Sequence, residues 1–446
     1  MNVLILGAAG KDFFVFQRLF KGKKAFKVKA FTAAQIQGIA GRRFPAKLAG
    51  KNYPAGIPIF EEKKLGRLIK ELKIGLCVFA YSDASLRHVA GLAEKCSKSG
   101  AGFMLPEAGR LMLESRKKVI AVTAVRTGAG KSPLTRRIIG LLKKAGKKVV
   151  VLRHPMPYGK LEKQIIERFV SMKDLERHEC TIEEREEFEP LIAKGIIVYA
   201  GVDYERILKQ AEKEADIIIW DGGNNDIPFI KPDLWLCVAD PLRQGDELSY
   251  YPGIINFLSA DVIVINKVNS AKPASVKKLI WNTKNFNPKA AIIKAESIIK
   301  AEESRRLKGM KVSEGRQSIK GKKVLVVEDG PSLTHGGMAF GAGYVFAERE
   351  KAVVVDAGKH AVGSIKKVFR NFKQIKKVLP AMGYSRKQLK DLQATINKAK
   401  ADFIVNASPI NLPSLIKLNK PCIQVSYELK EKGNALEKLL KKKGFM

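Results

Sequence analysis

The sequence predicts an α/β protein with a doubly wound, mostly parallel sheet, preceded by a smaller Rossmann-like α/β domain. Two observations predict this class. Short β-branched runs alternate with helical patterns along almost the whole chain, which is typical of parallel sheets covered by helices. The length of 446 residues indicates more than one domain, because a single core rarely grows past roughly 250–300 residues.

The first elements predict an N-terminal α/β domain at residues 1–116. Strands are expected at residues 3–6, 28–32 and 76–81, with a turn at residues 7–10 leading from the first strand into a helix. Residues 44–60 contain three prolines and two glycines and are expected to form a loop. A charged stretch at residues 114–118 ends this domain.

The remaining elements predict a nucleotide-binding core at residues 117–300 and a C-terminal α/β part at residues 301–446 that continues it. Strands of the core are expected at residues 119–125, 148–152, 196–199, 217–220, 234–239, 262–265 and 291–293. Residues 300–322 are polar and charged and are expected to form a linker. Strands of the C-terminal part are expected at residues 323–328, 352–355, 403–406 and 422–426.

Composition excludes several classes of protein. The chain is 46% hydrophobic and 28% charged, which excludes wholesale disorder, and it lacks an apolar run of about 18 residues that would span a membrane. The N-terminus has no basic leader or cleavage site. Five scattered cysteines argue against a disulfide framework or a structural zinc site. We therefore expect a soluble, cytoplasmic protein without membrane association.

The charge is strongly positive, with 82 Lys+Arg against 44 Asp+Glu and a formal net charge of +38. The lysines are spread along most of the chain, often in pairs such as Lys23-Lys24 and Lys366-Lys367. Such pairs are typical of solvated surface. A small polyanionic substrate and nonspecific affinity for nucleic acid are the alternatives.

The strongest motif follows the expected strand at residues 119–125. There, Gly128-Ala129-Gly130-Lys131-Ser132 leads into a helical pattern, the context that a phosphate-binding P-loop requires. We expect the backbone amides of the loop and Lys131 to bind the phosphates of a nucleotide, and the Ser132 hydroxyl to bind Mg²⁺. The expected nucleotide-binding residues are Thr127, Gly128, Ala129, Gly130, Lys131, Ser132 and Pro133. Val125 stands where the usual pattern has its first glycine.

Two residues are expected to assist the P-loop. Asp221 ends an apolar strand and is followed by two glycines and an asparagine, so it is the candidate Walker B residue and second Mg²⁺ ligand. Arg126 stands where the deviant P-loops of partition and septum-site ATPases carry a phosphate-binding lysine. An arginine suits phosphate oxygens; an ordinary exposed loop arginine is the alternative.

Asn266-Lys267-Val268-Asn269 resembles the base-binding element Asn-Lys-x-Asp of GTPases. The amide of Asn269 cannot offer the pair of acceptor oxygens that guanine requires. Asn266 and Lys267 are therefore expected to line the base pocket, and the expected nucleotide is ATP rather than GTP.

Further candidates are weaker. Arg153, His154 and Arg243 follow strands at the edge where phosphates bind, within loops 153–159 and 240–243. Residues 176–189 are rich in glutamate and are expected to form a solvated acidic helix, with a gate or Mg²⁺ ligands as alternatives. Residues 328–338 are rich in glycine and are expected to form a backbone anion nest. The turn at residues 7–10 resembles an incomplete dinucleotide-binding opening, which is weak support for NAD.

Taken together, these stretches resemble archaeal cyclic 2,3-diphosphoglycerate synthetase and its relatives over essentially the whole chain. The stretches that carry the resemblance are residues 1–12, 31–53, 126–137, 152–159, 177–181, 220–226, 249–253 and 329–338. The resemblance implies a P-loop core related to partition ATPases and signal-recognition GTPases. It also implies ATP-dependent closure of a phosphoanhydride ring in 2,3-bisphosphoglycerate, with release of ADP and phosphate.

This reaction would bring a polyanionic substrate next to ATP, so the site needs many cations. The expected catalytic residues are Lys131, Asp221, Arg126, Arg153 and His154, and the expected substrate-binding residues are Arg42, Arg43, Arg87, Arg136, Arg243 and His335. A homodimer is expected for a deviant P-loop protein. A regulatory or metallochaperone GTPase and a nucleic-acid-stimulated ATPase stay open as alternatives.

Overall fold

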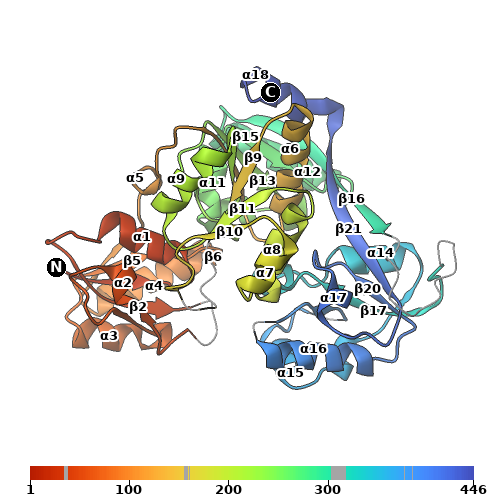
Figure 1. Cartoon of the computed structure of the whole chain (residues 1–446), viewed down its shortest axis with the longest axis horizontal. Coiled ribbons are helices and arrows are strands. Elements are labelled where there is room, and N and C mark those ends of the chain that lie inside the picture. Colours follow the sequence, from red (N-terminus) through yellow and green to blue (C-terminus); the bar gives the residue numbers. More distant parts are fainter. Residues whose placement is uncertain (35–38, 155–158, 160, 303–317, 376, 384) are drawn as a thin grey trace.

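The computed structural model describes residues 1–34, 39–154, 159, 161–302, 318–375, 377–383 and 385–446. Figure 1 shows three groups of elements, with the P-loop region in the middle, the N-terminal sheet on one side and the C-terminal elements on the other. Strands alternate with helices throughout the described residues and pair mainly in parallel. The predicted α/β fold class is confirmed.

The N-terminal region forms a sheet of its own, with the strand order β3-β4-β2-β1-β5-β7. Its strands are β1 (Asn2–Leu6), β2 (Lys27–Ala33), β3 (Arg43–Phe44), β4 (Ile57–Glu61), β5 (Leu76–Phe79) and β7 (Gly102–Met104). Its helices are α1 (Lys11–Leu19), α2 (Ala46–Ala49), α3 (Leu65–Glu71), α4 (Leu86–Lys98) and α5 (Ala108–Leu111).

The prediction of a loop at residues 44–60 is wrong. Ile57 and Ile59 are buried in β4, which pairs with β2 and β3. Pro58 lies in that strand, where β4 pairs with the short outer strand β3. Proline is tolerated near a sheet edge because the missing N–H removes few ladder bonds there.

The second sheet carries the P-loop. Its order is β10-β11-β9-β12-β8-β13-β15-β16-β21-β20-β17-β18, with β19 paired to β17. The strands before the C-terminal part are β8 (Lys118–Ala124), β9 (Val149–Leu152), β10 (Glu167–Phe169), β11 (Ile197–Ala200), β12 (Ile217–Trp220), β13 (Leu234–Ala239), β15 (Val262–Ile265) and β16 (Ala291–Glu302). The helices among them are α6 (Lys131–Lys144), α7 (Met172–Arg177), α8 (Ile182–Ile192), α9 (Tyr204–Glu214), α10 (Asp246–Ser249), α11 (Gly253–Ser259) and α12 (Pro273–Phe286).

The C-terminal part continues this sheet through a long ribbon. Strands β16 and β21 (Cys422–Glu431) pair antiparallel from Ala295↔Glu431 to Glu302↔Gln424, and Figure 1 shows them running together from the core to the C-terminal elements. The sequence predicted that β16 would end at residue 293. The strand continues to Glu302, because its residues from Ala295 onward pair with β21.

The other C-terminal elements pack around the end of this ribbon. The strands are β17 (Lys323–Glu328), β18 (Val353–Val354), β19 (Leu379–Pro380) and β20 (Phe403–Asn406), and the helices are α13 (Gly330–Thr334), α14 (Ala342–Arg349), α15 (Ser364–Asn371), α16 (Arg386–Lys398) and α17 (Leu412–Leu415). The last helix, α18 (Ala435–Lys442), returns to the core, where Leu436 and Leu440 join the hydrophobic cluster of α6 (Figure 1). Most of the predicted linker lies at residues 303–317, outside the described residues. The domain boundaries at residues 116 and 300 stay predictions.

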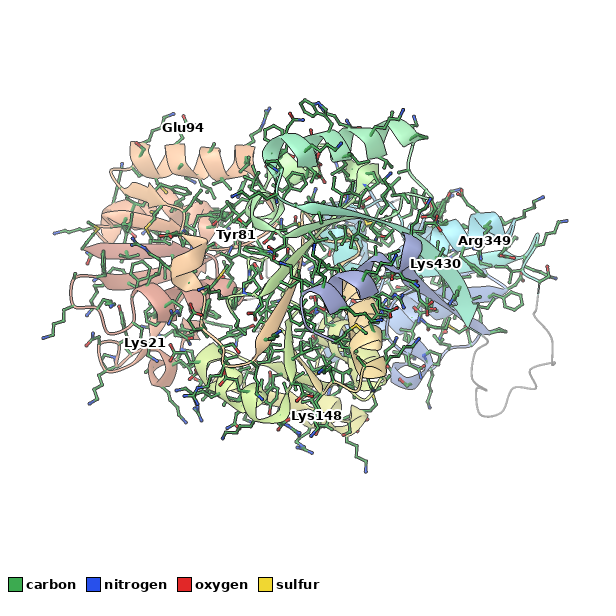
Figure 2. All side chains as sticks on the ribbon, turned by 90° about the horizontal axis from the view of Figure 1, so that it is seen from above. Lys21, Tyr81, Glu94, Lys148, Arg349 and Lys430 are labelled. Carbon is green, nitrogen blue, oxygen red and sulfur yellow. The ribbon has the colours of Figure 1, made fainter. Side chains whose placement is uncertain are left out.

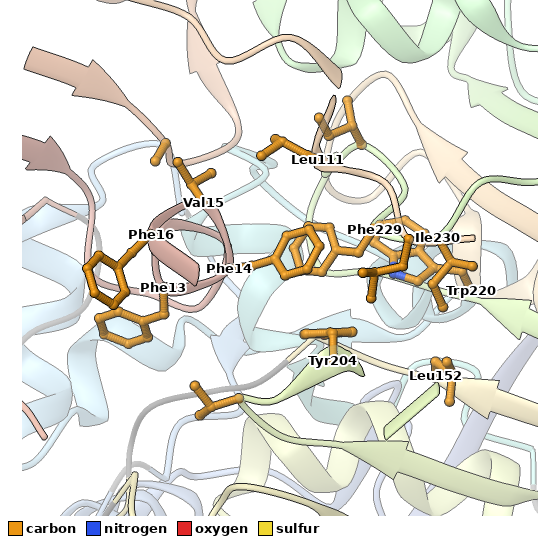
Figure 3. Packing of buried hydrophobic residues seen from close by; sticks show 14 of the residues in the cluster. Phe13, Phe14, Val15, Phe16, Leu111, Leu152, Tyr204, Trp220, Phe229 and Ile230 are labelled. Atoms are coloured by element: carbon orange, nitrogen blue, oxygen red, sulfur yellow. The ribbon is translucent and has the colours of Figure 1, made fainter. Parts of the chain in front are cut away.

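Aromatic side chains join the N-terminal sheet to the core. Phe14 of α1 stacks on Phe229 with ring centroids 4.2 Å apart, and Tyr204 and Trp220 complete this cluster (Figure 3). Burial of these rings supplies much of the hydrophobic stabilisation of the contact.

The charged side chains mostly lie outside. Lys21, Glu94, Lys148 and Arg349 point away from the ribbon in Figure 2, whereas Tyr81 lies inside. Among the described residues, no helix has the length and apolar character needed to span a bilayer.

Candidate nucleotide and substrate site

The P-loop follows β8, the strand between β12 and β13. Lys131 is the first residue of α6, and Gly130 precedes it with φ 112°. Gly128 also has a positive φ, of 82°, and glycine adopts such angles without a steric penalty. The strand–loop–helix context predicted for Thr127 to Pro133 is therefore formed, and the N-terminus of α6 supplies positive potential at the loop.

A chain of ion pairs joins Lys131 to α8. Asp221 directly follows β12, and its two carboxylate oxygens lie 2.5 Å from Nζ of Lys131 and 2.5 Å from Nη1 of Arg153. Arg153 also forms an ion pair with Glu187. Burial alone would raise the pKa of Asp221, but the charges of Arg153 and Lys131 outweigh it and lower the pKa. Asp221 is therefore ionised and holds Lys131 beside the loop.

Arg153 and His154 lie behind the P-loop. The Arg153 side chain is 1% exposed and lies between two carboxylates. His154 is half-buried, with Nδ1 3.8 Å from Glu187. Burial lowers the pKa of His154 despite the opposing charge of Glu187. Arg153 therefore orients Asp221. Residues 155–158 of the predicted loop 153–159 lie outside the described residues.

Asn266 and Lys267 contact the backbone of the P-loop. Asn266 donates to the carbonyl of Ala129 at 3.0 Å, and Lys267 donates to the carbonyl of Gly128 at 2.8 Å. Lys267 also pairs with Asp240 at 2.6 Å. These contacts fix the shape of the loop. Asn269 instead bonds with the backbone of Ser297 in β16.

Arg126 is a buried residue and not the exposed loop arginine of the alternative interpretation. Its guanidinium bonds with Asp83 at 2.9 Å and with Asp246 at 3.1 Å, and it lies over the ring of Tyr250. It also donates to the carbonyl of Gly336 at 3.3 Å. Arg126 therefore connects the N-terminal region, α10 and the C-terminal part at the entrance to the P-loop.

A pocket of about 230 Å³ extends from the P-loop to the C-terminal part of the sheet. Its lining contains four basic and four acidic side chains from the described residues: Arg126, Lys131, Arg136 and Lys267, with Glu186, Glu187, Glu328 and Asp329. Acidic and basic groups are thus equal in number here, although the whole chain is strongly basic. Such a lining does not fit a site built only for polyanions.

The acidic wall of the pocket comes partly from α8. The sequence predicted a solvated acidic helix here, and this prediction is wrong, because Glu183, Glu184 and Glu186 are only 3%, 5% and 6% exposed. Helix α8 packs between the core and the C-terminal part, and Oε1 of Glu186 accepts a hydrogen bond from Ser408 at 2.6 Å. The sequence alone does not show that the C-terminal part of the chain covers the charged face of α8.

The prediction that residues 328–338 form a backbone anion nest is wrong. The Glu328 side chain at the start of this stretch instead accepts hydrogen bonds from three backbone amides beyond its end, those of Gly341, Gly343 and Tyr344. The neighbouring Asp329 reaches the pocket and accepts a hydrogen bond from Ser332. The sequence predicted Glu186 and Glu187 only as parts of the acidic stretch 176–189 and Asp329 only as part of the stretch 328–338, and none of the three as a residue that binds a cationic group.

The predicted substrate-binding residues divide into two groups. Arg136 lines the pocket and donates to the carbonyl of Tyr427. Arg243 and His335 lie beside it, since Arg243 and Arg126 both donate to the carbonyl of Gly336. The other three predicted residues, Arg42, Arg43 and Arg87, belong to the N-terminal region and are not part of the pocket lining within the described residues.

The turn at residues 7–10 is closed by its own chain. Asp12 accepts hydrogen bonds from the backbone amides of Ala9 at 2.7 Å and Gly10 at 3.1 Å. Burial raises the pKa of Asp12 to about 6 against these hydrogen bonds. Amides that would bind the phosphates of a dinucleotide are therefore already bonded.

The donors predicted for Mg²⁺ are the Ser132 hydroxyl and the Asp221 carboxylate. Both are hard oxygen ligands of the kind Mg²⁺ takes, and Ser132 lines the pocket. Both oxygens of Asp221 already face a cation, so the ion would compete with Lys131 or bind through water. Among the described residues, no cluster of three His, Cys, Asp or Glu side chains forms a metal site.

Comparison with known proteins identifies the family. No family model matches the chain. Arginine synthetase ArcE of Thermococcus kodakarensis is 51% identical over 433 residues, which cover 97% of this chain and 94% of that protein. The chain belongs to the arginine synthetase ArcE family.

A solved structure shows a weaker likeness. LpxK from Aquifex aeolicus, in complex with ATP, is 14% identical and covers 74% of this chain and 90% of its own, with a TM-score of 0.41. We draw no conclusion from a likeness of this size.

Membership of the ArcE family corrects the sequence-based resemblance. The resemblance to cyclic 2,3-diphosphoglycerate synthetase and the predicted cyclisation of 2,3-bisphosphoglycerate are both wrong, because the 51% identity with arginine synthetase ArcE overturns them. The regulatory GTPase, metallochaperone and nucleic-acid-stimulated ATPase alternatives give way for the same reason. The P-loop and the strand end at Asp221 indicate only how the phosphates of a nucleotide are bound, and many P-loop proteins share these motifs. They do not indicate which acceptor receives the phosphoryl group.

Proposed function

We propose that this protein is an ATP-dependent arginine synthetase. The observation that carries the proposal is the 51% identity with arginine synthetase ArcE over 97% of the chain. The pocket supports it, because Lys131 and Ser132 of the P-loop share one cavity with Glu186 and Asp329. Such a cavity suits a nucleotide phosphate next to a cationic amino acid.

The chemistry of arginine formation indicates how ATP is used. A guanidino group differs from a ureido group by a nitrogen in place of the ureido oxygen. Transfer of the γ-phosphoryl group of ATP to that oxygen releases ADP and creates a leaving group. Ammonia then attacks the carbon, the C–O bond breaks, and phosphate leaves. The balance is ureido amino acid + ATP + ammonia → arginine + ADP + phosphate.

The chain's own residues have defined tasks in this proposal. Lys131 and the loop amides bind the phosphates and stabilise charge on the transferred group. Asp221 orients Lys131, and Arg153 orients Asp221. Mg²⁺, bound through Ser132 and Asp221, would neutralise charge on the β- and γ-phosphates.

The test is direct synthesis. Purified protein is incubated with Mg·ATP, citrulline and ammonium, and arginine, ADP and phosphate are measured. We expect equal amounts of the three products, and the reverse reaction from arginine, ADP and phosphate should yield ATP. Lys131→Ala should lower turnover by about 100-fold or more, because transition-state charge loses its partner. ATP hydrolysis without arginine in either direction would overturn the proposal.

We retain the homodimer and the nonspecific affinity for nucleic acid as proposals. Light scattering coupled to size-exclusion chromatography tests the first, and a salt titration of binding to a DNA duplex tests the second, because phosphate contacts make affinity depend steeply on salt.

A further inference from the structure

Two carboxyl groups face the pocket from the two parts of the large sheet. Glu186 lies on α8 of the P-loop part, and Asp329 follows β17 of the C-terminal part. Ser408 donates to Oε1 of Glu186 at 2.6 Å, and Ser332 donates to Oδ2 of Asp329 at 2.5 Å. These hydroxyl groups hold both carboxyls in place without neutralising them.

The second oxygen of Glu186 lacks a hydrogen-bond donor. The residue is 6% exposed, and Oε2 receives no hydrogen bond from the part of the chain that the structure describes. A buried carboxylate without donors is costly. Burial raises the pKa of Glu186 well above its usual range, and the neighbouring Asp329 raises it further through its charge and a hydrogen bond between the two carboxyl groups. A cationic ligand placed here would relieve this cost.

The basic side chains of the pocket have other partners. Lys131 pairs with Asp221 and Lys267 with Asp240. Arg126 pairs with Asp83 and Asp246, and Arg136 donates to the backbone carbonyl of Tyr427 at 3.1 Å. The counter-charge that Glu186 and Asp329 require is therefore best supplied by a ligand.

The position of Glu186 and Asp329 relative to Lys131 indicates which end of an amino-acid substrate would lie against them. Glu187, the neighbour of Glu186, is joined through Arg153 and Asp221 to Lys131. The acidic wall thus adjoins the phosphate-binding lysine. In the proposed function, the end of the amino acid next to the γ-phosphate is the end that reacts, and in arginine that end is the guanidinium.

We propose that Glu186 and Asp329 bind the guanidinium group of arginine and so form the specificity site of the synthetase. The planar guanidinium presents its donors in a fork that two carboxylates can receive. This inference rests on the proposed function, and it adds the residues that recognise the product.

The experiment compares a cationic and a neutral ligand of the same length. Calorimetry measures binding of arginine and of citrulline to the full chain and to Glu186→Gln and Asp329→Asn, which keep side-chain shape. We expect each variant to weaken arginine binding about tenfold or more, because a charge-assisted hydrogen bond is lost. The Kd for citrulline should change less than about threefold. Citrulline has the same α-amino and α-carboxyl groups, so it isolates the guanidinium.

The matched control is Glu189→Gln on the same helix. Glu189 lies outside the pocket lining and accepts a hydrogen bond from the backbone of Asn411 at 3.2 Å. This variant should bind both ligands as the unmodified protein does. Binding of ADP, measured in each variant, shows whether the P-loop remains folded.

The outcomes separate the two proposals. If the unmodified protein forms and binds arginine but Glu186→Gln and Asp329→Asn bind it equally well, the specificity site is wrong and the proposed function stands. An equal loss for arginine and citrulline would place the α-ammonium group at these carboxyls, and would also overturn the inference. If the unmodified protein neither forms nor binds arginine, both proposals fail.

Discussion

Gly130 shows how one residue shapes the P-loop. Its φ of 112° lies in the region that side chains disfavour. A Cβ at this position would also collide with Nδ2 of Asn266, the group that donates to the carbonyl of Ala129 at 3.0 Å. Glycine is therefore required both by the backbone conformation and by the close approach of Asn266.

We predict that Gly130→Ala weakens nucleotide binding by about tenfold or more and destabilises the fold by about 1–3 kcal/mol, the usual cost of such backbone strain. Calorimetry with ATP and urea unfolding measure the two effects. Gly140→Ala within α6, the helix that follows Gly130, is the control, because nothing lies within 4 Å of the added Cβ. That substitution should stabilise the protein by up to about 1 kcal/mol. Unchanged ATP binding by Gly130→Ala would contradict the role given to the loop shape.

At the scale of elements, α7, α8 and β10 form a unit that buries acidic side chains. Glu167 of β10 is 5% exposed, and Oε1 lies 3.2 Å from Nδ1 of His178 at the end of α7. Burial, followed by the charge of Glu184, raises the pKa of Glu167 to about 8. Burial lowers the pKa of His178, and Arg177 adds to this. A protonated Glu167 beside a neutral His178 satisfies both groups.

The stability of this unit should depend on pH. The pKa of Glu167 is higher in the folded protein than its ordinary value of 4.5, so the folded state binds the proton more tightly. Its contribution to stability is complete below pH 4.5 and is lost as the pH rises to about 8. Glu167→Gln should remove this dependence, so the variant should gain stability relative to the unmodified protein as the pH rises.

Urea unfolding at several pH values between 4.5 and 8.5 provides the measurement. The exposed Glu71→Gln, which loses an i,i+4 pair with Arg67, should differ from the unmodified protein by a nearly constant amount. A constant difference for Glu167→Gln as well would show that Glu167 ionises in the folded state as it does in the unfolded chain.

At the scale of the whole molecule, Arg126 joins regions that are far apart in the sequence. It pairs with Asp83 of the N-terminal region and contacts the carbonyl of Gly336 in the C-terminal part. The side chains of Arg126 and Asp83 are 10% and 1% exposed. Removing Arg126 leaves the buried carboxylate of Asp83 without its cation. Replacing Asp83 as well removes that charge, while Asp246, the second partner of Arg126, still lacks its cation.

We predict that Arg126→Ala lowers the free energy of unfolding by about 3–5 kcal/mol and that adding Asp83→Asn restores part of it. A double-mutant cycle by urea unfolding measures the coupling. Arg67→Ala, which breaks an exposed pair with Glu71, should cost at most about 1 kcal/mol. Strict additivity of Arg126→Ala and Asp83→Asn would show that the two side chains are not coupled in solution.

Several features could be predicted from the sequence because they depend on local patterns. The strands at residues 217–220, 234–239, 262–265, 323–328 and 403–406 have the predicted bounds, since continuous apolar runs of this length suit buried parallel strands. The P-loop context could be predicted because glycine, lysine and the helix start are consecutive in the chain.

The sequence by itself thus determined the α/β class and the strand–loop–helix context of the predicted P-loop. Only the tertiary structure decided what lies opposite the loop. Glu186 and Asp329 are more than 140 residues apart and meet because the ribbon β16–β21 carries the C-terminal part beside α8. Their burial depends on that packing, so the residues that would recognise a substrate have no local pattern, whereas those that would bind its phosphate donor do.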